Sequence, residues 1–274
     1  MELVRPDSVA GAVAALGNGS VALGGGTELI PLLRDRIVEA ATLVELRRAV
    51  PRGVDGTAIG AGTTLGELEV DPEIPTALRE ACRLSASPQL RAMGTIGGNL
   101  LQATRCWYWR LQFPCRLHGG DRCHAREGQQ REHAIFANDF CASAHPSDPA
   151  AALLALGATV RTDRRELPIA GLYRLPTEDD RSTTTLEPDE LILELEVPRP
   201  DASTYLKAMD RRRWSFALVG VAAARFGDDV RFGFAGVAPI PWAQPENPTP
   251  LPGTAYKVQI LEALVARARQ AVAA

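Results

Sequence analysis

The stretch VALGGGTELIPLL (residues 21–33) sets three consecutive glycines between a strand-like run and a helix-like run. Because Gly24, Gly25 and Gly26 carry no side chains, backbone N–H groups can approach one point closely, and the positive end of the following helix is directed at the same point. Such a turn suits a phosphate or a pyrophosphate. No Gly-Lys-[Ser/Thr] follows, and the spacing differs from G-x-G-x-x-G, so neither nucleotide motif applies and a plain tight turn stays open.

A second glycine turn, GTIGGNL (residues 94–100), lies about 70 residues further along the chain. Thr95 adds a hydroxyl group and Asn99 adds an amide, while Gly97 and Gly98 permit close approach of a ligand to the backbone. One such turn is weak support for ligand binding. Two of them predict a site that holds the two phosphates of a dinucleotide between them.

Soft metal ligands are concentrated in the segment that follows the second turn. Four of the five cysteines form the pattern C-x8-C-x7-C-x17-C, and all four histidines lie between residues 118 and 145. Zinc sites usually contain a C-x2–4-C pair, which is missing here, whereas four thiolates on an irregular loop can ligate an iron–sulfur cluster. A cluster, zinc and a metal-free loop all stay open at this point. The fifth cysteine, Cys82, fits the apolar face of a helix and is expected to be a buried thiol.

The composition fits a globular protein of one large domain or two modest ones. Of the 274 residues, 46% are apolar and 23% are charged, and the net charge of −3 gives no general signal for nucleic-acid binding. No apolar run approaches the roughly 18–20 residues needed to span a bilayer, and the N-terminus lacks a signal-peptide pattern. We expect a cytoplasmic protein, with export alongside a signal-bearing partner as the alternative. The odd number of cysteines argues against a disulfide framework.

The pattern of expected helices and strands changes near residue 170. Before it, short strands alternate with helices, which are expected at residues 8–17, 27–37, 75–85 and from about 148. After it, the runs at residues 191–198, 203–211, 216–227 and 229–240 suit an antiparallel sheet. An amphipathic helix is expected at residues 254–273, and the six prolines within residues 239–253 predict an extended connection.

Seven stretches together resemble the FAD-binding (medium) subunit of molybdenum hydroxylases, the xanthine dehydrogenase and aldehyde oxidoreductase family. In chain order they are GGGTELIPLL, LVELRRAV, IGAGTTLGEL, RAMGTIGGNLLQA, HPSDPAAALLALGATV, DELILELEVP and YLKAMDRR, and they span nearly the whole chain. The resemblance implies an α+β fold. A two-lobed FAD-binding domain of the vanillyl-alcohol oxidase type would occupy residues 1–170, and a smaller α+β domain of antiparallel sheet and helix would occupy residues 171–274, with the flavin in the cleft.

Carried over by position, the resemblance assigns the FAD pyrophosphate to the first turn. The pyrophosphate would be wrapped by the backbone of Ala22, Leu23, Gly24, Gly25, Gly26 and Thr27, and the turn would be closed by Glu28 and Leu29. The other side of the dinucleotide would be bound by Thr95, Gly98 and Asn99. No catalytic acid or base is required from this chain.

Four further residues match FAD-binding positions of the family. Asp148 matches its ribose-binding acid, since a carboxylate accepts hydrogen bonds from vicinal hydroxyls, and Leu191 and Ile192 match apolar residues that pack on the flavin or adenine. Lys207 matches a lysine near the pyrimidine edge of the flavin, where a cation would stabilise the reduced anionic form. The alternatives are a helix N-cap for Asp148 and an exposed strand lysine for Lys207.

The cysteine-rich segment resembles an insertion, at about residues 104–145, that a minority of the family carries. Examples are the FAD subunits of 4-hydroxybenzoyl-CoA reductase and of a bacterial periplasmic-type aldehyde oxidoreductase, and TRCWYWR, CHAREG and HAIFANDFCASAHPSDPA look most like the latter. The resemblance implies a [4Fe–4S] cluster on Cys106, Cys115, Cys123 and Cys141. The histidines are expected to form hydrogen bonds within the loop, and its six arginines (105, 110, 116, 122, 126 and 131) to offset the cluster's charge.

The aromatic run Trp107-Tyr108-Trp109 would shield such a cluster from water or pack on a partner. Aromatics interleaved with arginines also occur in proteins that bind single-stranded nucleic acid. The small excess of positive charge and the lack of an RNA-binding signature make that interpretation poor here.

These features predict an electron-transfer flavoprotein subunit of a molybdenum-containing oxidoreductase. A molybdopterin-binding large subunit would oxidise the substrate, and a small subunit with two [2Fe–2S] clusters would pass electrons to the FAD of this chain. The acceptor would be ferredoxin, NAD or oxygen. The alternative is a zinc-stabilised binding or scaffold protein without a redox role. One departure from the family is the short, proline-rich AQPENPTPLPGT (residues 243–254), where a further helix is usual.

Overall fold

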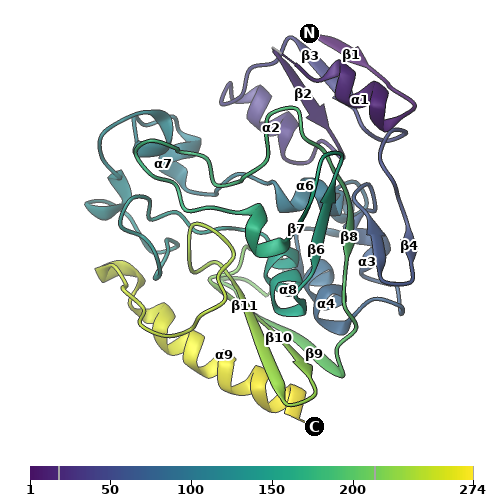
Figure 1. Ribbon diagram of the computed structural model, residues 1–274. Helices are drawn as coiled ribbons and strands as arrows, with labels where there is room; N and C mark the ends of the chain where they lie inside the picture. Colours follow the sequence, from purple (N-terminus) through teal and green to yellow (C-terminus); the bar gives the residue numbers. More distant parts are fainter. Residues whose placement is uncertain (18, 213, 274) are drawn as a thin grey trace.

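The computed structural model describes residues 1–17, 19–212 and 214–273. The chain begins with a small parallel sheet in the order β1-β3-β2, formed by β1 (Glu2–Val4), β2 (Ser20–Leu23) and β3 (Thr42–Glu45). Helix α1 (Val9–Ala15) follows β1, and helix α2 (Leu29–Arg34) follows β2 (Figure 1). Ser8 caps α1 by accepting a hydrogen bond from the Gly11 N–H, as the sequence predicts.

A second, five-stranded sheet is antiparallel and has the order β4-β5-β8-β6-β7. Its strands are β4 (Val54–Asp55), β5 (Ala58–Gly60), β6 (Thr159–Thr162), β7 (Glu166–Pro168) and β8 (Ile192–Glu196). The helices of this part are α3 (Leu65–Leu68), α4 (Thr76–Leu84), α5 (Pro88–Arg91), α6 (Ile96–Leu100) and α8 (Asp148–Leu156), and η3 (Ile169–Leu172) is a short 3-10 turn.

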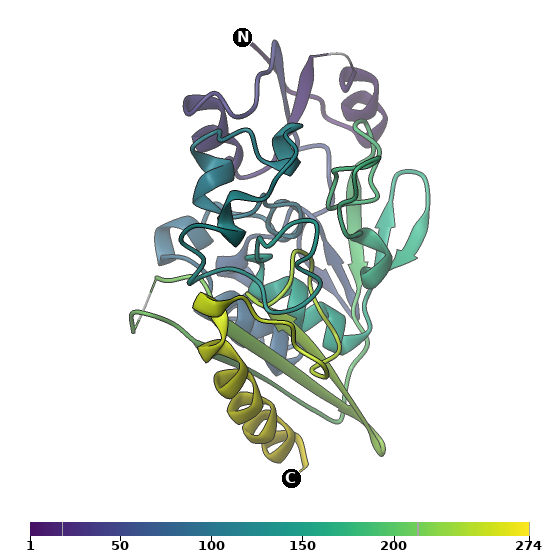
Figure 2. The same ribbon diagram turned by 90° about the vertical axis from the view of Figure 1, so that its left-hand side faces the viewer.

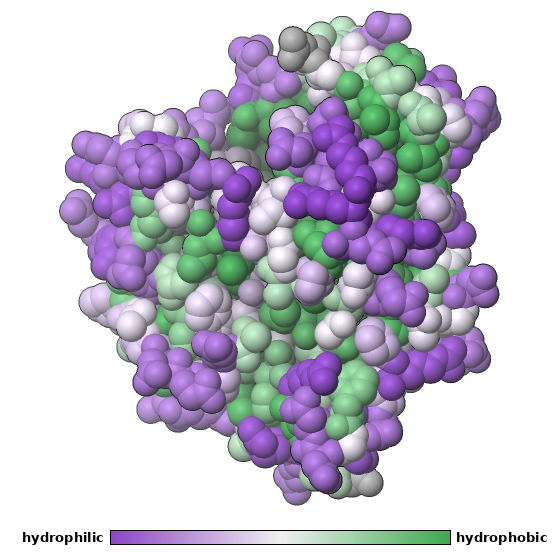
Figure 3. Space-filling model, in the orientation of Figure 1, coloured by the Kyte–Doolittle hydropathy of each residue, from purple (hydrophilic) through white to green (hydrophobic). Residues whose placement is uncertain are grey.

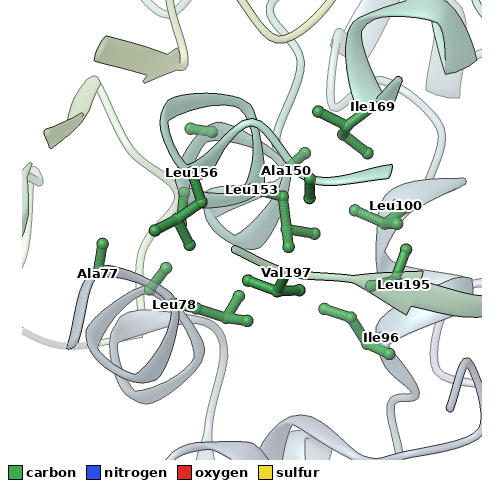
Figure 4. Close-up of a cluster of buried hydrophobic side chains, with 14 of the residues drawn as sticks. Ala77, Leu78, Ile96, Leu100, Ala150, Leu153, Leu156, Ile169, Leu195 and Val197 are labelled. Carbon is green, nitrogen blue, oxygen red and sulfur yellow. The ribbon is translucent and has the colours of Figure 1, made fainter. Parts of the chain in front are cut away.

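The main hydrophobic core lies between this sheet and helices α4, α6 and α8. Figure 4 shows Leu153 and Leu156 of α8 turned toward Leu78 of α4, with Leu195 and Val197 of the β8 segment beside them. Helix α8 is buried on nearly every side, which explains its run of alanines and leucines. The helix therefore forms the centre of the molecule, and its first turn is held rigidly.

The third sheet consists of β9 (Ala202–Ala208), β10 (Val219–Phe226) and β11 (Asp229–Ala235) in the order β11-β10-β9. The long C-terminal helix α9 (Tyr256–Ala273) covers one face, and α4 and α8 cover the other (Figures 1 and 2). Alternation along β10 matches this layering, because Val221 and Ala223 pack in the cluster with α9 whereas Ala222 and Ala224 join the main core. The expected terminal helix and strands β9–β11 are confirmed.

The insertion between α6 and α8 has little regular structure. It contains α7 (Trp107–Arg110) and two short 3-10 turns, η1 (Arg116–His118) and η2 (His124–Arg126). The proline-rich connection lies against it: Asn138 Nδ2 donates to Thr249 O at 2.8 Å, and Thr249 N donates to Ile135 O at 2.7 Å. The connection is extended, as predicted, apart from η4 (Pro252–Thr254). It therefore closes one side of the insertion in place of a further helix.

One expected strand belongs to a different sheet. The sequence groups residues 191–198 with the later antiparallel strands, but β8 pairs with β5 and β6 in the five-stranded sheet. That grouping is wrong, and the change of sheet falls between Glu196 and Ala202 rather than near residue 170. The α+β class of the fold is confirmed. Among the described residues, no helix combines the length and apolar character needed to cross a membrane.

Candidate functional site

The two glycine turns lie directly against each other. A Cβ atom at Gly25 would lie 1.8 Å from Met93 O, so only glycine allows this contact between the backbones. Gly94 of the second turn also faces the first turn, less tightly, since a Cβ atom there would be 3.2 Å from Thr27 Oγ1. The prediction that the turns act as a pair is therefore supported by their packing, and the glycines fix how closely the turns approach.

The second turn is the start of helix α6. Thr95 is the N-cap residue, and its hydroxyl accepts a hydrogen bond from Gly98 N at 3.2 Å. Ser147 Oγ donates to Asn99 Oδ1 at 2.6 Å, which joins this turn to the start of α8. Helix α2 after the first turn has only six residues, so its dipole adds less than the sequence suggests. In the second turn, backbone N–H groups already donate within the protein: Gly94 to Leu90 O, Ile96 to Thr63 O, Gly97 to Ala61 O and Gly98 to Thr95 Oγ1. The backbone of the first turn is therefore the main candidate for binding an anion.

A cavity of about 270 Å³ opens beside the paired turns. Seven of the predicted FAD-binding residues line it: Thr27, Glu28, Thr95, Gly98, Asn99, Asp148 and Lys207. Trp214 and Phe216, from the segment between β9 and β10, line it from the other side. The first part of the chain and the third sheet therefore meet at this cavity, which we call the FAD cavity after the ligand that the sequence predicts for it.

The remaining predicted residues do not line this cavity. Ala22 and Leu23 end strand β2, Gly24, Gly25 and Gly26 form the turn behind the cavity wall, and Leu29 begins α2. Leu191 and Ile192 are only 4% and 6% exposed and pack in two separate hydrophobic clusters. Direct contact of these two side chains with the flavin or adenine stays a prediction.

Asp148 is buried at the floor of the FAD cavity and is held by three side chains. Tyr205 donates to its Oδ1 at 2.5 Å, while Lys207 Nζ and Ser85 Oγ lie 2.7 Å and 3.2 Å from its Oδ2. Burial, followed by the negative charge of Asp148, raises the pKa of Tyr205 well above its usual value. The N-cap of α8 is Ser147, so the alternative role of Asp148 as the cap is wrong.

Lys207 is not an exposed strand lysine, because its side chain is only 1% exposed. It also donates to Leu84 O at 2.9 Å, which ties strand β9 to the end of α4. Its charge is balanced by Asp148, so any field it exerts on a flavin is that of an ion pair rather than of a lone cation.

The carboxylate of Glu28 points toward the insertion. Its Oε2 lies 2.7 Å from Arg105 Nη1, and its Oε1 lies 2.5 Å from Arg110 Nη2. Two of the six arginines expected to offset a cluster's charge, Arg105 and Arg110, thus pair with Glu28, and their effect on a cluster stays a prediction. Arg131 pairs with Asp210, while Arg116 and Arg126 donate to backbone carbonyls of the loop.

The four cysteines of the insertion line one narrow cavity, which we call the cysteine cavity. They are Cys106, Cys115, Cys123 and Cys141. The volume of this cavity is only about 10 Å³. Within the part of the chain that the structure describes, no group of three or more Cys, His, Asp or Glu side chains converges closely enough for a single metal ion.

Burial and hydrogen bonds define the chemistry of these thiols. Burial raises the pKa of Cys106 to about 11 and that of Cys141 to about 12, and neighbouring thiols of the set add to both shifts. Backbone N–H groups of α7 oppose the shift at Cys106. His133 Nε2 lies 3.2 Å from Cys106 Sγ, and Cys141 Sγ lies 3.3 Å from Ser143 Oγ. A positive cofactor at this point would favour the thiolate forms.

Aromatic side chains cover the cysteine cavity. Tyr108, Trp109 and Phe140 line it, and the Tyr108 hydroxyl is fixed by a hydrogen bond from Gln129 N at 2.7 Å. Three of the histidines make hydrogen bonds within or beside the loop, as predicted, and His118 Nε2, for example, lies 2.9 Å from Trp109 O. Cys82 is fully buried in α4, away from this cavity, which confirms its expected role.

The FAD cavity and the cysteine cavity are neighbours. A third cavity, of about 230 Å³, shares Arg105, Trp214 and Phe216 with the FAD cavity, and it shares Cys106 with the cysteine cavity. Residues 105 and 106 are adjacent in the chain, so one peptide unit belongs to the walls of both sites. Figure 3 shows that hydrophilic side chains cover the outside of the insertion, with apolar residues toward the middle of that face.

Sequence reasoning missed several residues of this site, including Ser85, Arg105, Tyr205 and Phe216. The sequence does indicate Tyr205, because it lies two positions before Lys207 on the same strand and its side chain is therefore on the same face. The other three come from turns and loops whose positions depend on packing, and no local pattern indicates them.

The fold and the paired turns define an FAD-binding domain. A family model described as the FAD binding domain in molybdopterin dehydrogenase matches residues 1–200. The chain therefore belongs to this family and is the FAD-binding flavoprotein subunit of a molybdenum hydroxylase-type oxidoreductase.

Individual relatives agree with this family. The aldehyde oxidoreductase FAD-binding subunit PaoB of Escherichia coli K12 is 33% identical over 244 residues, which cover 82% of this chain and 76% of that protein. The carbon monoxide dehydrogenase medium chain of Afipia carboxidovorans is 41% identical over 107 residues, 35% of this chain and 37% of that protein.

Solved structures show the same fold at lower identity. Carbon monoxide dehydrogenase from Hydrogenophaga pseudoflava superimposes with a TM-score of 0.70 at 23% identity, covering 99% of this chain and 96% of that one. Quinoline 2-oxidoreductase from Pseudomonas putida 86 gives a TM-score of 0.70 at 17% identity with the same coverage.

Proposed function

We propose that this chain carries electrons within an aldehyde oxidoreductase-type complex. A molybdopterin-binding large subunit would oxidise the substrate, and a small subunit with two [2Fe–2S] clusters would relay the electrons. This chain would hold the FAD, which supplies electron transfer to ferredoxin, NAD or oxygen. The main support is the similarity to an aldehyde oxidoreductase FAD-binding subunit over 82% of the chain. Relatives that are themselves subunits or medium chains of larger enzymes also support the presence of partners.

The residues of the FAD cavity fit a dinucleotide. FAD, when bound, supplies exchange between two-electron and one-electron transfer. The first turn would offer backbone N–H groups to its pyrophosphate. The hydroxyl of Thr95 and the amide of Asn99 border the cavity from the second turn. Asp148 faces the cavity as a carboxylate held in one orientation, which suits ribose hydroxyls.

We further propose that the insertion binds a [4Fe–4S] cluster on Cys106, Cys115, Cys123 and Cys141. The observation that carries this is the convergence of all four thiols on one covered cavity, together with the lack, within the described ranges, of a three-residue group suited to a single ion. A polynuclear cluster needs its four ligands further apart than one zinc ion does.

The chain's own groups prepare this site. Backbone N–H groups of α7 lie near Cys106 Sγ, and His133 Nε2 can donate to the same atom. Burial lowers the pKa of His133 to about 4, so the ring is neutral at neutral pH and has one N–H to donate. Tyr108 and Trp109 exclude water from the cavity.

The test is anaerobic purification of the full chain together with its partner subunits. We expect a flavin band near ~450 nm with a broad iron–sulfur shoulder, and about four iron atoms in addition to those of the partner's two [2Fe–2S] clusters. Serine at any one of the four cysteines should lower the iron content, whereas Cys82→Ala, outside the cavity, should not. Wild-type iron content in all four serine variants would refute the cluster, and a colourless protein with stoichiometric zinc would refute the redox function.

A further inference from the structure

The first glycine turn is tied to the insertion through one carboxylate. Glu28 directly follows the turn, and its two oxygens are held by Arg105 and Arg110, both from the first seven residues of the insertion. Ala103 N also donates to Glu28 Oε1 at 3.1 Å. The family resemblance assigns Glu28 to closing the turn. In this structure the carboxylate of Glu28 is bound by residues of the insertion and by the backbone just before it.

This cluster is partly buried and carries an excess positive charge. The side chains of Glu28, Arg105 and Arg110 are 18%, 29% and 19% exposed, so solvent screens them less than it screens a surface ion pair. Two guanidinium groups surround one carboxylate, which leaves one positive charge unbalanced. Glu28, which holds both guanidinium groups, lies two residues after Gly26 of the turn that we assign to the pyrophosphate of FAD.

Both arginines are fixed in place. Arg110 Nε donates to Thr104 O at 2.9 Å, which closes the start of the insertion onto α7. Arg105 Cζ lies 4.7 Å from the centroid of the Phe216 ring, in the segment between β9 and β10. Arg105 lines the FAD cavity, contacts Glu28 and Phe216, and directly precedes Cys106 in the chain.

We propose that Arg105 and Arg110 are positioning residues of the FAD site, and that through them the insertion contributes to FAD affinity. They hold the first turn in its binding position by way of Glu28, and their unbalanced charge attracts the pyrophosphate. The proposal rests on the proposed function, because it takes the cavity beside the turns to be occupied by FAD.

The test compares arginine variants of the full chain, purified with its partner subunits and titrated with FAD by flavin fluorescence. Arg105→Met and Arg110→Met keep much of the side-chain length and remove the charge, and we expect each to weaken FAD binding about tenfold. Arg105→Lys should restore most of the loss. The exposed Arg122, in the same insertion, provides the control variant Arg122→Met, which should bind FAD as wild type does.

The salt dependence of FAD affinity distinguishes electrostatic attraction of the pyrophosphate from a role in which the arginines only hold the first turn in place. Wild-type affinity should fall with ionic strength more steeply than that of the two methionine variants, since they lack one attracting charge. Iron content should stay at the wild-type level in all of these variants. Affinities within twofold of wild type would overturn the proposal, as would a loss that Arg105→Lys does not restore and that leaves the salt dependence unchanged.

Failure of the proposed function has a different signature. Wild-type protein that binds no FAD would refute that function, while wild-type protein with FAD but no iron beyond that of the partner's two [2Fe–2S] clusters would refute only the cluster in this chain. The arginine comparison uses FAD affinity alone, so it remains decisive in the second case.

Discussion

Replacing Gly25 by alanine tests whether the contact between the two glycine turns creates the FAD site. The new Cβ atom would lie 1.8 Å from Met93 O and 2.6 Å from Met93 C, both of them backbone atoms. Non-bonded heavy atoms pack best at roughly 3.5–4.0 Å, so the turns would have to separate by more than an ångström. No flexible side chain can absorb that movement.

The energetic cost of Gly25→Ala follows from the known cost of overpacking a filled space. Adding a methyl group to a filled space costs about 1–3 kcal/mol, and a clash with backbone places Gly25→Ala at the upper end. FAD needs both turns in their paired arrangement. In the variant, restoring that arrangement costs the strain energy, so the free energy of FAD binding becomes less favourable by about that amount. About 3 kcal/mol corresponds to a loss of FAD affinity of ~100-fold.

The assay is titration of FAD-depleted protein, followed by flavin fluorescence, with thermal unfolding measured in parallel. Gly17→Ala is the matched control, because a Cβ atom at Gly17 would meet no atom within 4 Å. It should bind FAD as wild type does. If Gly25→Ala binds FAD within about threefold of wild type, a difference of ~0.7 kcal/mol, the contact between the turns does not determine binding and our account of the site is wrong.

Three further predictions concern buried charges. Breaking the Asp148–Lys207 pair by Lys207→Met leaves a buried carboxylate unpaired, so the free energy of unfolding should fall by about 3–5 kcal/mol; urea denaturation measures this, and a loss below about 1 kcal/mol would contradict the burial argument. Lys257→Met removes a buried ammonium that donates to three carbonyls (Glu132, His133 and Gly236); we expect a lower Tm and exposure of the insertion to proteolysis, and unchanged proteolysis would refute its anchoring role. Glu190 has its pKa lowered to about 2: burial raises the value, but hydrogen bonds from Arg165 and Thr162 outweigh it. Its stabilising effect is therefore complete above its ordinary pKa of 4.5 and is lost as the pH falls toward 2. Glu190→Gln should unfold less steeply with acid over that range, and an acid-unfolding curve parallel to that of wild type would count against this.

The local elements were predictable because their signals are local. Helix α1 follows from Ser8 and the apolar period behind it, α9 from its amphipathic pattern, and the β10–β11 hairpin from the two residues Gly227 and Asp228 between alternating strands. The two turns were predictable as well, since glycine runs between a strand and a helix permit few arrangements. Each of these features depends on fewer than about 20 neighbouring residues.

Pairing between distant segments was not predictable in the same way. Strand β8 has the alternation of a half-buried strand, and that pattern fits either sheet equally well. Its partners β5 and β6 are separated from it by long stretches of chain, so only packing decides the choice. The network around Asp148 has the same origin, because α4, α8 and β9 must all be in place before Ser85, Tyr205 and Lys207 can meet the carboxylate.

The irregular spacing of the cysteines follows from how the insertion is attached. Arg105 at its start and Pro146 just beyond its end both line the FAD cavity, so the loop leaves and returns at one place. Between these points it is held by the proline-rich connection at Thr249 and by Lys257 of α9, both about a hundred residues away in the chain. A zinc knuckle brings its ligands together by a local turn and therefore needs a fixed short spacing. Here the surrounding fold positions the thiols, so the spacing between them is free to vary as long as the anchors at both ends remain.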